Sequence, residues 1–585
     1  MSICKRGVDE KCFVPQPSFS EASRCLSANS RQFPMYVIHA ENLLQMERMK
    51  PHQELLADGL LEEHDMSSQT TSVTFVSHEW SSVAHPDPHG VQLLALKDMI
   101  VGLRDGSCEL HYDMVNFFRP QMCRPVNIKE LKALCRGYFW IDYLSIPQVC
   151  CCSEAEERQV QADMRAAVMS LHTYVAHCSF FVILAPIHYH ESGRLMSRCS
   201  WKSRGWCQFE LAVNGLLGSG TKPTLHVDGR ALWHVNYFSF WQLSPCCGDF
   251  TKDEDRYFIA DALHQVMEHM EASLRSSDNV HRILLLQNVR KELLKCNGLM
   301  LSGSARSAHK HLKEKLPSGG EFWTSLHYAA ALDDVELVRT LLKANADVKA
   351  RTKVKDVDFF LPSGQTPLHV WAAFSGDVSV AKCLLQHRAQ VDEEDSDGIT
   401  PLMISCQMGN QQSCRTLLRM EADPNVRDQY SMTSIFVAVG CDHPEIIHPL
   451  LDYEADPHVK WAGVGLLHCA AGHCTALPWD CVQRLLKEGL ELNGPCTIRI
   501  FSKMGLVLAF RALLHKQLRD LFALVQGVPP LLLTTVRGNV GALQTLVRAR
   551  ADLQCDRTFS SVQDILQRSC IPERIFYTLL HEPAD

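Results

Sequence analysis

Residues 70–230 alternate between two spacings of apolar positions. Short runs rich in β-branched and aromatic residues predict strands at 73–77, 138–142, 179–185 and 224–227. Between them, apolar residues recur every three or four positions, which predicts amphipathic helices at 91–103, 160–175 and 206–217. Strands that alternate with helices predict an α/β fold with an open parallel sheet, and such sheets bind ligands near the carboxyl ends of their strands.

The C-terminal half carries one pattern several times. Its first residue is a Thr that precedes a helix of small residues, and it recurs at steps of 42, 34 and 33 residues, at Thr324, Thr366, Thr400 and Thr433. A second helix that ends in a Leu pair follows in each unit. Motif and period resemble the ankyrin repeat, whose signature is T-P-L-H-x-A. One unit cannot bury its apolar face alone, so the resemblance implies an all-α solenoid of stacked units.

The array has two irregular stretches. Residues 353–362 lengthen the first step and are interpreted as an insertion at a hairpin tip. The next equivalents of the Thr motif begin at Gly465 and Pro529, which are 64 residues, or two periods, apart. This spacing predicts a degenerate repeat at 502–527, and therefore about seven repeats over residues 321–585, the last two degenerate.

Composition and charge narrow the class of protein. Of 585 residues, 46% are hydrophobic and 21% charged, as is typical of soluble globular proteins. The 66 acidic residues exceed the 58 basic ones, which argues against nucleic-acid binding. No apolar run is long enough to span a membrane, and charged residues occupy the start, where a secretory signal would be apolar. We therefore expect a soluble, cytoplasmic protein without membrane insertion, whose 25 cysteines are reduced.

Four segments of the predicted α/β module carry short motifs that follow one another along the chain. They are Phe75-Val-Ser-His78, Phe139-Trp-Ile-Asp142, Ser179-Phe-Phe-Val-Ile-Leu-Ala-Pro186 and Trp206-Cys-Gln-Phe-Glu-Leu211. In order and type they resemble the TIR (Toll/interleukin-1 receptor) domain, which implies a flavodoxin-like parallel sheet. The architecture is also similar to TIR-like modules fused to ankyrin arrays in protist proteins, including His78-Glu-Trp80 followed by His85-Pro-Asp-Pro-His89.

The resemblance implies a candidate site around Glu210. In the enzymatic members of that family, a Glu four residues after the Trp cleaves NAD between ribose and nicotinamide, and Glu210 occupies this position. A carboxylate suits the reaction because it stabilises the oxocarbenium-like charge of glycosidic cleavage. The residues that the resemblance adds to the nucleotide pocket and its binding loop are Ser77, Trp80, Asp142, Ser145 and Trp206.

Two departures from the family pattern leave the role of Glu210 open. Residues 144–152 do not look like the usual glycine-containing TIR loop, and His78-Glu79 replace the polar or basic residue often found after the first strand. Glu210 is therefore either a catalytic carboxylate or a solvated residue on a helix face, in a module retained for self-association. Trp80 and Trp206 have two interpretations as well, core or pocket.

Neither a metal site nor a resident cofactor is expected. The cysteines at 150–152 are adjacent, whereas zinc ligands are usually two or more residues apart. Prolines between His85 and His89 prevent the helix on which these two could bind a metal together. Residues 215–222 resemble a phosphate-binding loop, but they lack its Gly-Lys-Ser/Thr ending and follow a helix instead of a strand.

Together these patterns predict a multidomain protein. We expect a partly disordered N-terminal extension at 1–69, a TIR-like α/β domain at 70–235, a helical connector and linker at 236–320, and an ankyrin array at 321–585. The array predicts an intracellular scaffold or signalling adaptor that binds a protein partner on its concave surface, with self-association through the TIR-like module. The alternative is an NAD-cleaving hydrolase that its array directs to a target, with NAD as substrate.

Overall fold

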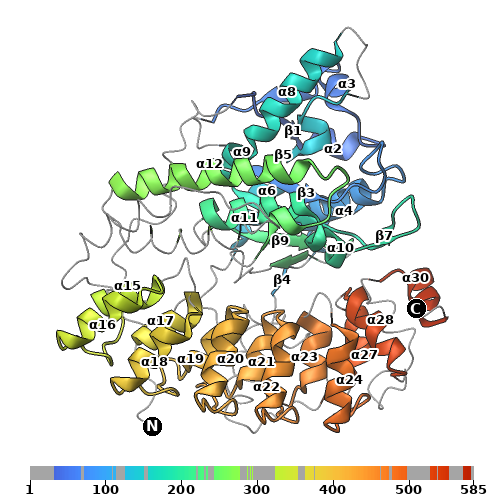
Figure 1. Ribbon diagram of the computed structural model, residues 1–585. Helices are drawn as coiled ribbons and strands as arrows, with labels where there is room; N and C mark the ends of the chain where they lie inside the picture. The colour runs from blue at the N-terminus through green and yellow to red at the C-terminus, as the bar shows by residue number, and fades with distance from the viewer. Residues whose placement is uncertain are drawn as a thin grey trace, which may run out of the picture.

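The computed structural model describes two parts of the chain that pack together (Figure 1). The described residues are 32–66, 71–108, 110–112, 126–149, 156–218, 222–229, 232–234, 243–276, 283, 286, 290, 293, 323–353, 363–374, 376–461, 463–473, 477–496, 528–536, 538–551 and 571–581. The expected disordered start, the linker at 302–320 and the degenerate repeat at 502–527 therefore lie outside the described residues.

A mixed sheet forms the centre of the N-terminal part, with the strand order β2-β1-β5-β3-β6-β9-β10-β4 in the described residues. Its strands are β1 (Tyr36–His39), β2 (Leu61–Glu63), β3 (Val73–His78), β4 (Leu110–Tyr112), β5 (Tyr138–Ile141), β6 (Phe180–Leu184), β9 (Thr224–Val227) and β10 (Leu232–His234). The central strands β5, β3, β6 and β9 are parallel. Their register places Phe75 between Trp140 and Phe181, and the three rings stack on one face of the sheet.

Helices cover both faces of this sheet. The face that includes Phe75 packs against α11 (Gly205–Gly218) and α12 (Asp255–Ser276), and the face that includes Val76 packs against α4 (Val91–Asp105). Burial on both sides explains why β6 is apolar along its whole length, and every residue of β3 is buried as well. The other helices of this part are α2 (Ala40–Gln45), α3 (His52–Ala57), α6 (Ile128–Leu134), α7 (Asp142–Ser145), α8 (Glu157–Met169), α9 (Leu171–His177) and α10 (Arg198–Ser203).

The α/β module is larger than the sequence patterns indicate. β1 pairs with β5 in antiparallel orientation, with His39 opposite Tyr138, and β2 continues the sheet outward. The boundary expected at residue 70 therefore falls inside the sheet, which includes residues 36–63. On the other side, α12 of the expected connector belongs to the apolar core of the module.

The C-terminal part is a stack of six helix pairs in the described residues (Figure 1). The pairs are α15 (Ser325–Ala331) with α16 (Val335–Lys343), α17 (Pro367–Phe374) with α18 (Val378–Gln386), α19 (Pro401–Gln407) with α20 (Gln411–Arg419), α21 (Ser434–Gly440) with α22 (Ile447–Asp452), α23 (Leu466–His473) with α24 (Trp479–Lys487), and α27 (Pro530–Val536) with α28 (Val540–Arg548). A further helix, α30 (Glu573–His581), contacts α28. The first helices of neighbouring pairs pack directly on one another.

Buried histidines connect neighbouring pairs. His369 Nδ1 lies 2.9 Å from the Thr366 hydroxyl, and its Nε2 lies 2.9 Å from the carbonyl oxygen of Ile399 in the next pair. Burial lowers the pKa of His369 to about 4, so the ring is neutral at pH 7. Since a carbonyl can only accept, Nε2 carries the proton and donates. His327 makes the equivalent bond one repeat earlier.

The fifth and sixth helix pairs of the described stack are adjacent in space. His468 donates to the carbonyl of Val528 at 3.0 Å, and the backbone amide of Cys496 donates to the same carbonyl at 3.2 Å. α27 accordingly packs directly on α23. No repeat separates these pairs within the described stack, although the sequence leaves room for one.

The α/β module rests on the array. The hairpin of β7 (His188–Tyr189) and β8 (Leu195–Met196) brings Ile187 and Leu195 into one apolar cluster with Val464 and Ala471 of the fifth repeat. Among the described residues, none of the helices combines the length and the apolar character needed to cross a membrane.

Candidate functional site

A hydrogen-bonded Ser–Glu pair lies at the carboxyl end of β3. The Ser77 hydroxyl donates to Glu210 Oε2 at 2.5 Å, and the indole N–H of Trp201 donates to Ser77 Oγ at 3.1 Å. Ser77 and Trp201 are fully buried, whereas Glu210, on α11, is half-buried. The strand end fixes Ser77, and the helix that covers this face of the sheet brings the carboxylate to it. Glu210 is thus directed at the sheet and is not a freely solvated helix-face residue.

A second polar cluster adjoins this pair. His78, the last residue of β3, contacts Asp142 Oδ1 through Nε2 at 2.7 Å and Gln92 Oε1 through Nδ1 at 2.8 Å. The indole N–H of Trp80 donates to the other oxygen of Asp142 at 2.9 Å. Asp142 directly follows β5, the neighbouring parallel strand. The parallel register therefore brings two strand ends, and their polar side chains, to one place.

Burial and neighbouring charges set the protonation of the Ser–Glu pair. Burial raises the pKa of Glu210 to about 8, and the nearby Asp142 carboxylate adds to this shift. The Ser77 hydrogen bond and His78 act in the opposite direction. Glu210 is consequently mostly protonated at pH 7, with an ionised fraction that increases just above neutrality. A carboxyl group in this range can exchange a proton or stabilise a developing positive charge.

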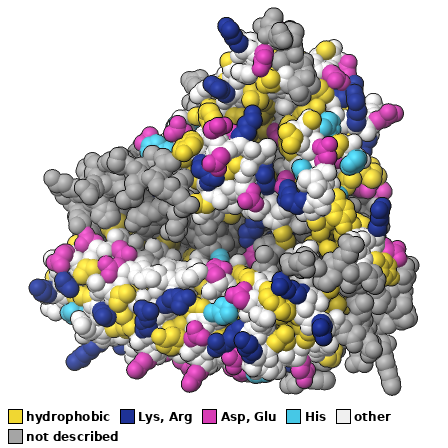
Figure 2. All heavy atoms as spheres, turned by 45° about the vertical axis from the view of Figure 1, so that its right-hand side comes forward, with side chains coloured by type: hydrophobic (Ala, Val, Ile, Leu, Met, Phe, Trp, Pro, Cys, Tyr) yellow, Lys and Arg dark blue, Asp and Glu magenta, His cyan; other side chains and the backbone are white. Residues whose placement is uncertain are grey.

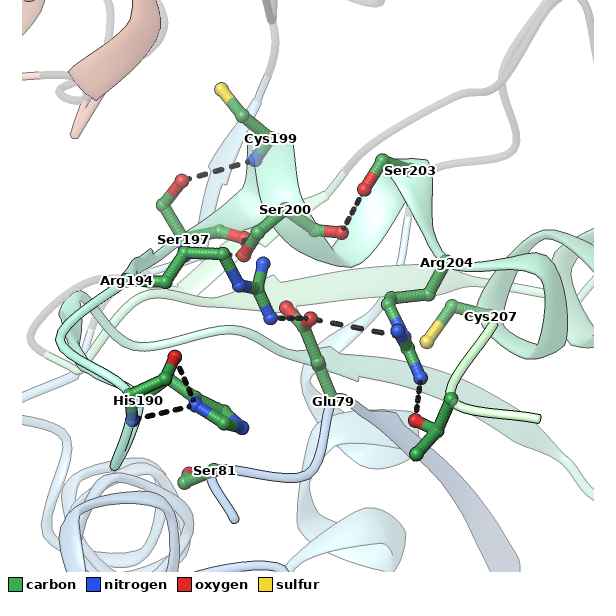
Figure 3. A network of polar contacts seen from close by, with 12 residues as sticks. Glu79, Ser81, His190, Arg194, Ser197, Cys199, Ser200, Ser203, Arg204 and Cys207 are labelled. Carbon is green, nitrogen blue, oxygen red and sulfur yellow. Dashed lines mark hydrogen bonds and ion pairs between the residues drawn. The ribbon is translucent and has the colours of Figure 1, made fainter. Parts of the chain in front are cut away.

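Glu79 forms the outer edge of the site, where two arginines converge on it (Figure 3). Its carboxylate lies 2.5 Å from Arg194 and 3.8 Å from Arg204 and is 5% exposed. Arg204 also donates to the Thr251 hydroxyl at 2.7 Å. The residue that follows His78 is therefore a buried carboxylate, and the basic groups beside it come from the β7–β8 hairpin and the end of α10.

The structure brings four of the six residues singled out by the sequence to these clusters. Ser77 contacts Glu210, and Trp80 contacts Asp142. Ser145 is buried in α7, where its hydroxyl accepts from the backbone amide of Ile141 at 3.3 Å, so its contact is with the backbone of its own loop. The indole of Trp206 donates to Asp255 of α12 at 3.0 Å and packs edge-on against Phe209. This position connects α11 to α12.

Three residues of the site are not among those that the sequence singles out for it. Trp201 occupies a short helix without a periodic pattern, yet it binds the Ser77 hydroxyl. His78 departs from the pattern of TIR domains, and its Nε2 contacts Asp142. Gln92 looks like an ordinary residue of α4, but its amide donates to the backbone carbonyls of Glu79 and Pro86 and fixes the loop after β3.

Thiol and metal chemistry have weak support in the described residues. Burial, reinforced by Glu210, holds the pKa of Cys207 far above its usual range, so this thiol is protonated at neutral pH. His448, Asp480 and Cys481 of the array have ligand atoms within 4.8 Å of one another. His448 is hydrogen-bonded to Asp480 at 2.8 Å, and burial raises the pKa of Cys481 to about 12. We assign this group to a contact between repeats.

Fold and site define a protein of two packed parts: an α/β module with a polar cluster at its strand ends, and a stack of helix pairs. Residues 326–428 and 370–461 match a family model described as ankyrin repeats (3 copies). The C-terminal array therefore contains ankyrin repeats, and such repeats point to a protein-interaction function. The α/β module lies outside the matched residues.

One solved structure similar to this chain is the ankyrin repeat domain of Bcl-3, described as a unique member of the IkappaB protein family. It is 20% identical, and the alignment covers 44% of this chain and 98% of that chain with a TM-score of 0.32. The assignment of the repeats rests on the family model and on the stacked helix pairs, and not on this likeness.

Proposed function

We propose that the chain is a scaffold or signalling adaptor whose ankyrin array binds a protein partner on its concave surface. The observation that carries this proposal is a row of exposed charged side chains at equivalent positions of successive hairpin turns: Arg351, Glu394, Arg427 and Lys460. α21 starts at one of these hairpins and ends at the turn where Asp442 pairs with Lys202 of the α/β module. The hairpin before α21 therefore lies at the end of the helix that is away from this contact.

The charge pattern supports a protein partner. On the face seen in Figure 2, acidic and basic side chains are interspersed over the array. Nucleic-acid sites present a single basic patch or stripe, whereas protein interfaces have polar rims of both signs.

Crosslinking of the full chain to its partner in cells, with identification by mass spectrometry, tests the proposal. Combined Arg427→Glu and Lys460→Glu substitutions should abolish the crosslinks made by the wild type. Arg339→Glu on α16, an exposed residue of a second helix, is the matched control and should keep them. Crosslinks that survive the double substitution, or that disappear only after changes in residues 70–230, would contradict binding by the array.

A second candidate function is cleavage of NAD by a TIR-like module, between ribose and nicotinamide, with Glu210 as the catalytic carboxylate. The specific observation in its favour is the partly buried Ser77–Glu210 hydrogen bond at the strand ends, where α/β sheets bind ligands. Ionised Glu210 would stabilise an oxocarbenium-like transition state. Since the module is also proposed to associate with itself, turnover has to be measured at several protein concentrations.

Release of nicotinamide from NAD by the purified full chain tests this candidate. Glu210→Gln keeps the size and a hydrogen-bonding group but cannot ionise, and it should abolish turnover. Glu191→Gln, at an exposed position, is the matched control and should retain it. Lack of turnover by the wild type, even when the protein is concentrated or clustered, would exclude the candidate.

A further inference from the structure

The short helix α10 lies between the candidate site and the ankyrin array. It follows the β7–β8 hairpin and leads directly into α11, the helix that carries Glu210. Ser197 caps the start of α10: its hydroxyl accepts from the backbone amide of Cys199, and its backbone amide donates to the Ser200 hydroxyl. These bonds make α10 a defined turn of helix. Its consecutive residues Trp201 and Lys202 point to different parts of the molecule.

On the side of the site, Trp201 determines how Ser77 can be used. An indole N–H is a donor only, so the Ser77 oxygen accepts from Trp201 and must direct its own hydrogen elsewhere. That hydrogen goes to Glu210. The indole thus fixes both the rotamer of Ser77 and the direction of its hydrogen bond to the carboxylate. Since Trp201 is only 1% exposed, its ring has little freedom to move independently of α10.

On the side of the array, α10 is held by charge and packing. Lys202 Nζ lies 2.5 Å from Asp442 Oδ2, in the turn that follows α21, and the two side chains are 30% and 17% exposed. The backbone of Gly541, at the start of α28, hydrogen-bonds to Cys199. Figure 3 shows the Cys199 sulfur pointing away from Glu79 and its arginines. Two repeats therefore contact one turn of helix.

We propose that the ankyrin array positions the Ser77–Glu210 pair through α10, with Trp201 as the positioning residue and the Lys202–Asp442 ion pair as the link. Because Trp201 and Lys202 are neighbours in one helical turn, a shift of Asp442 relative to the sheet moves the indole relative to Ser77. A partner that bends or straightens the array would alter the geometry at Glu210. This regulatory consequence rests on the proposed activity of Glu210, whereas the link itself can be measured without turnover.

The indole resonance of Trp201, observed by NMR in the deuterated, ¹⁵N-labelled full chain and assigned with Trp201→Phe among the 10 tryptophans, tests the link. Asp442→Asn removes the charge and suits the backbone there, because Asp442 has φ 65° and Asn tolerates this region. We expect this substitution to shift the Trp201 resonance. The resonance should also report the ionisation of Glu210, and the pH midpoint of that ionisation should move by about half a unit, a threefold change in the protonation equilibrium. Lys202→Met should have the same effect, and the double variant no more than either single one.

Matched controls separate this link from general destabilisation. Lys202→Arg keeps the charge and should leave the resonance at its wild-type position. Asp452→Asn breaks the pair with Arg484 in the same region of the array and should leave it unchanged as well. An unmoved resonance in Asp442→Asn, additive effects in the double variant, or an equal shift in Asp452→Asn would each overturn the proposal.

Nicotinamide release, measured on the same samples, distinguishes the two proposals. If Trp201 responds as expected but the wild type releases no nicotinamide, the link stands and NAD cleavage is rejected. If the wild type cleaves NAD and Trp201 does not respond to Asp442→Asn, NAD cleavage stands and the link is rejected.

Discussion

His78 Nε2 and Asp142 Oδ1 lie 2.7 Å apart at the ends of two adjacent parallel strands. Burial alone would disfavour charge on both residues. The Asp142 carboxylate outweighs it and, together with the hydrogen bond to Gln92, raises the pKa of His78 to about 9. In return, His78 and the Trp80 indole outweigh burial and lower the pKa of Asp142. The pair is therefore charged at pH 7, and the stability of the module depends on pH.

The first prediction concerns His78→Gln. Because the folded state raises the pKa of His78 from 6.5 to about 9, it binds the proton more tightly than the unfolded chain does. The stabilisation is complete below pH 6.5 and is lost as the pH rises through 9. Urea unfolding across this window should show the difference in unfolding free energy between wild type and variant shrinking toward high pH. A difference that does not change with pH would contradict the charged pair.

The second prediction concerns Glu210→Gln, which acts in a lower pH window. The pKa of Glu210 rises from 4.5 to about 8 on folding, so ionisation is harder in the folded state and the wild type loses stability as the pH rises between these values. The variant should lack this loss, which has an upper limit of about 1.4 kcal/mol per pH unit. Parallel denaturant curves of Glu191→Gln, whose side chain is exposed, should follow the wild type.

The array should have the opposite pH dependence. Burial lowers the pKa of His327, His369 and His468 from 6.5 to about 4, so the unfolded chain binds more protons than the folded one between these values. The stability of the array is therefore expected to be complete above pH 6.5 and to fall as the pH falls toward 4. Hydrogen exchange of the repeat helices, compared with that of β3 and β6, would separate the two halves. Equal pH profiles in both would refute this assignment.

The His369→Ala substitution tests how much the buried histidine between repeats contributes to the unfolding free energy. It removes a fully buried ring and leaves the carbonyl of Ile399 without its donor, so we expect a loss of about 2–4 kcal/mol in unfolding free energy. His458 is the matched control, because it bonds to the carbonyl of Glu488 in the same way but is exposed. Thermal unfolding of His458→Ala should differ little from that of the wild type. Similar losses in the two variants would show that burial is not the cause.

A stabilising substitution is expected at Glu421. The residue two positions after each second helix has a positive φ, at Asn345, Arg388, Glu421, Glu454, Gly489 and Arg550. Left-handed backbone costs a residue with a Cβ about 1–2 kcal/mol, and glycine avoids most of this cost despite its larger chain entropy. We expect Glu421→Gly to increase the unfolding free energy by about 0.5–1 kcal/mol. Glu421→Ala should give no such increase, which separates backbone strain from loss of charge.

The elements of the fold were largely predictable, because the strand and helix spacings of apolar residues are both clear. The strand expected at 73–77 is β3, and the one expected at 224–227 is β9, since buried β-branched and aromatic runs leave few alternatives. The strands β10 and β4 at one end of the sheet, each three residues long, are too short to show a period. The degenerate repeat at 502–527 was inferred from length alone and lies outside the described residues, whereas the direct packing of the fifth pair on the sixth depends on contacts such as that of His468 with Val528, which no length can indicate.

The candidate site was predictable only where a residue belongs to a strand end or a helix motif. Ser77 met the first condition and Glu210 the second. Trp201 met neither, because it reaches Ser77 across 124 positions through tertiary packing of α10. Trp206 belongs to a motif that resembles one of TIR domains, but α12 lies close enough for the Trp206 indole to donate to Asp255. The motif determines which side of α11 a residue lies on, but the contacts of that residue depend on which helix packs against that side.

The shared carbonyl of Val528 gives the array an unusual property. Because Cys496 and His468 both donate to it, hydrogen bonds and helix packing align the fifth and sixth layers, in addition to the chain that joins them. The entropy of closing a loop grows only with the logarithm of its length, by about 0.6 kcal/mol for each doubling. The chain can therefore gain or lose tens of residues at this point at a nearly constant free energy. This point of the array is therefore a place where evolution can insert new sequence while the order of the repeats is kept.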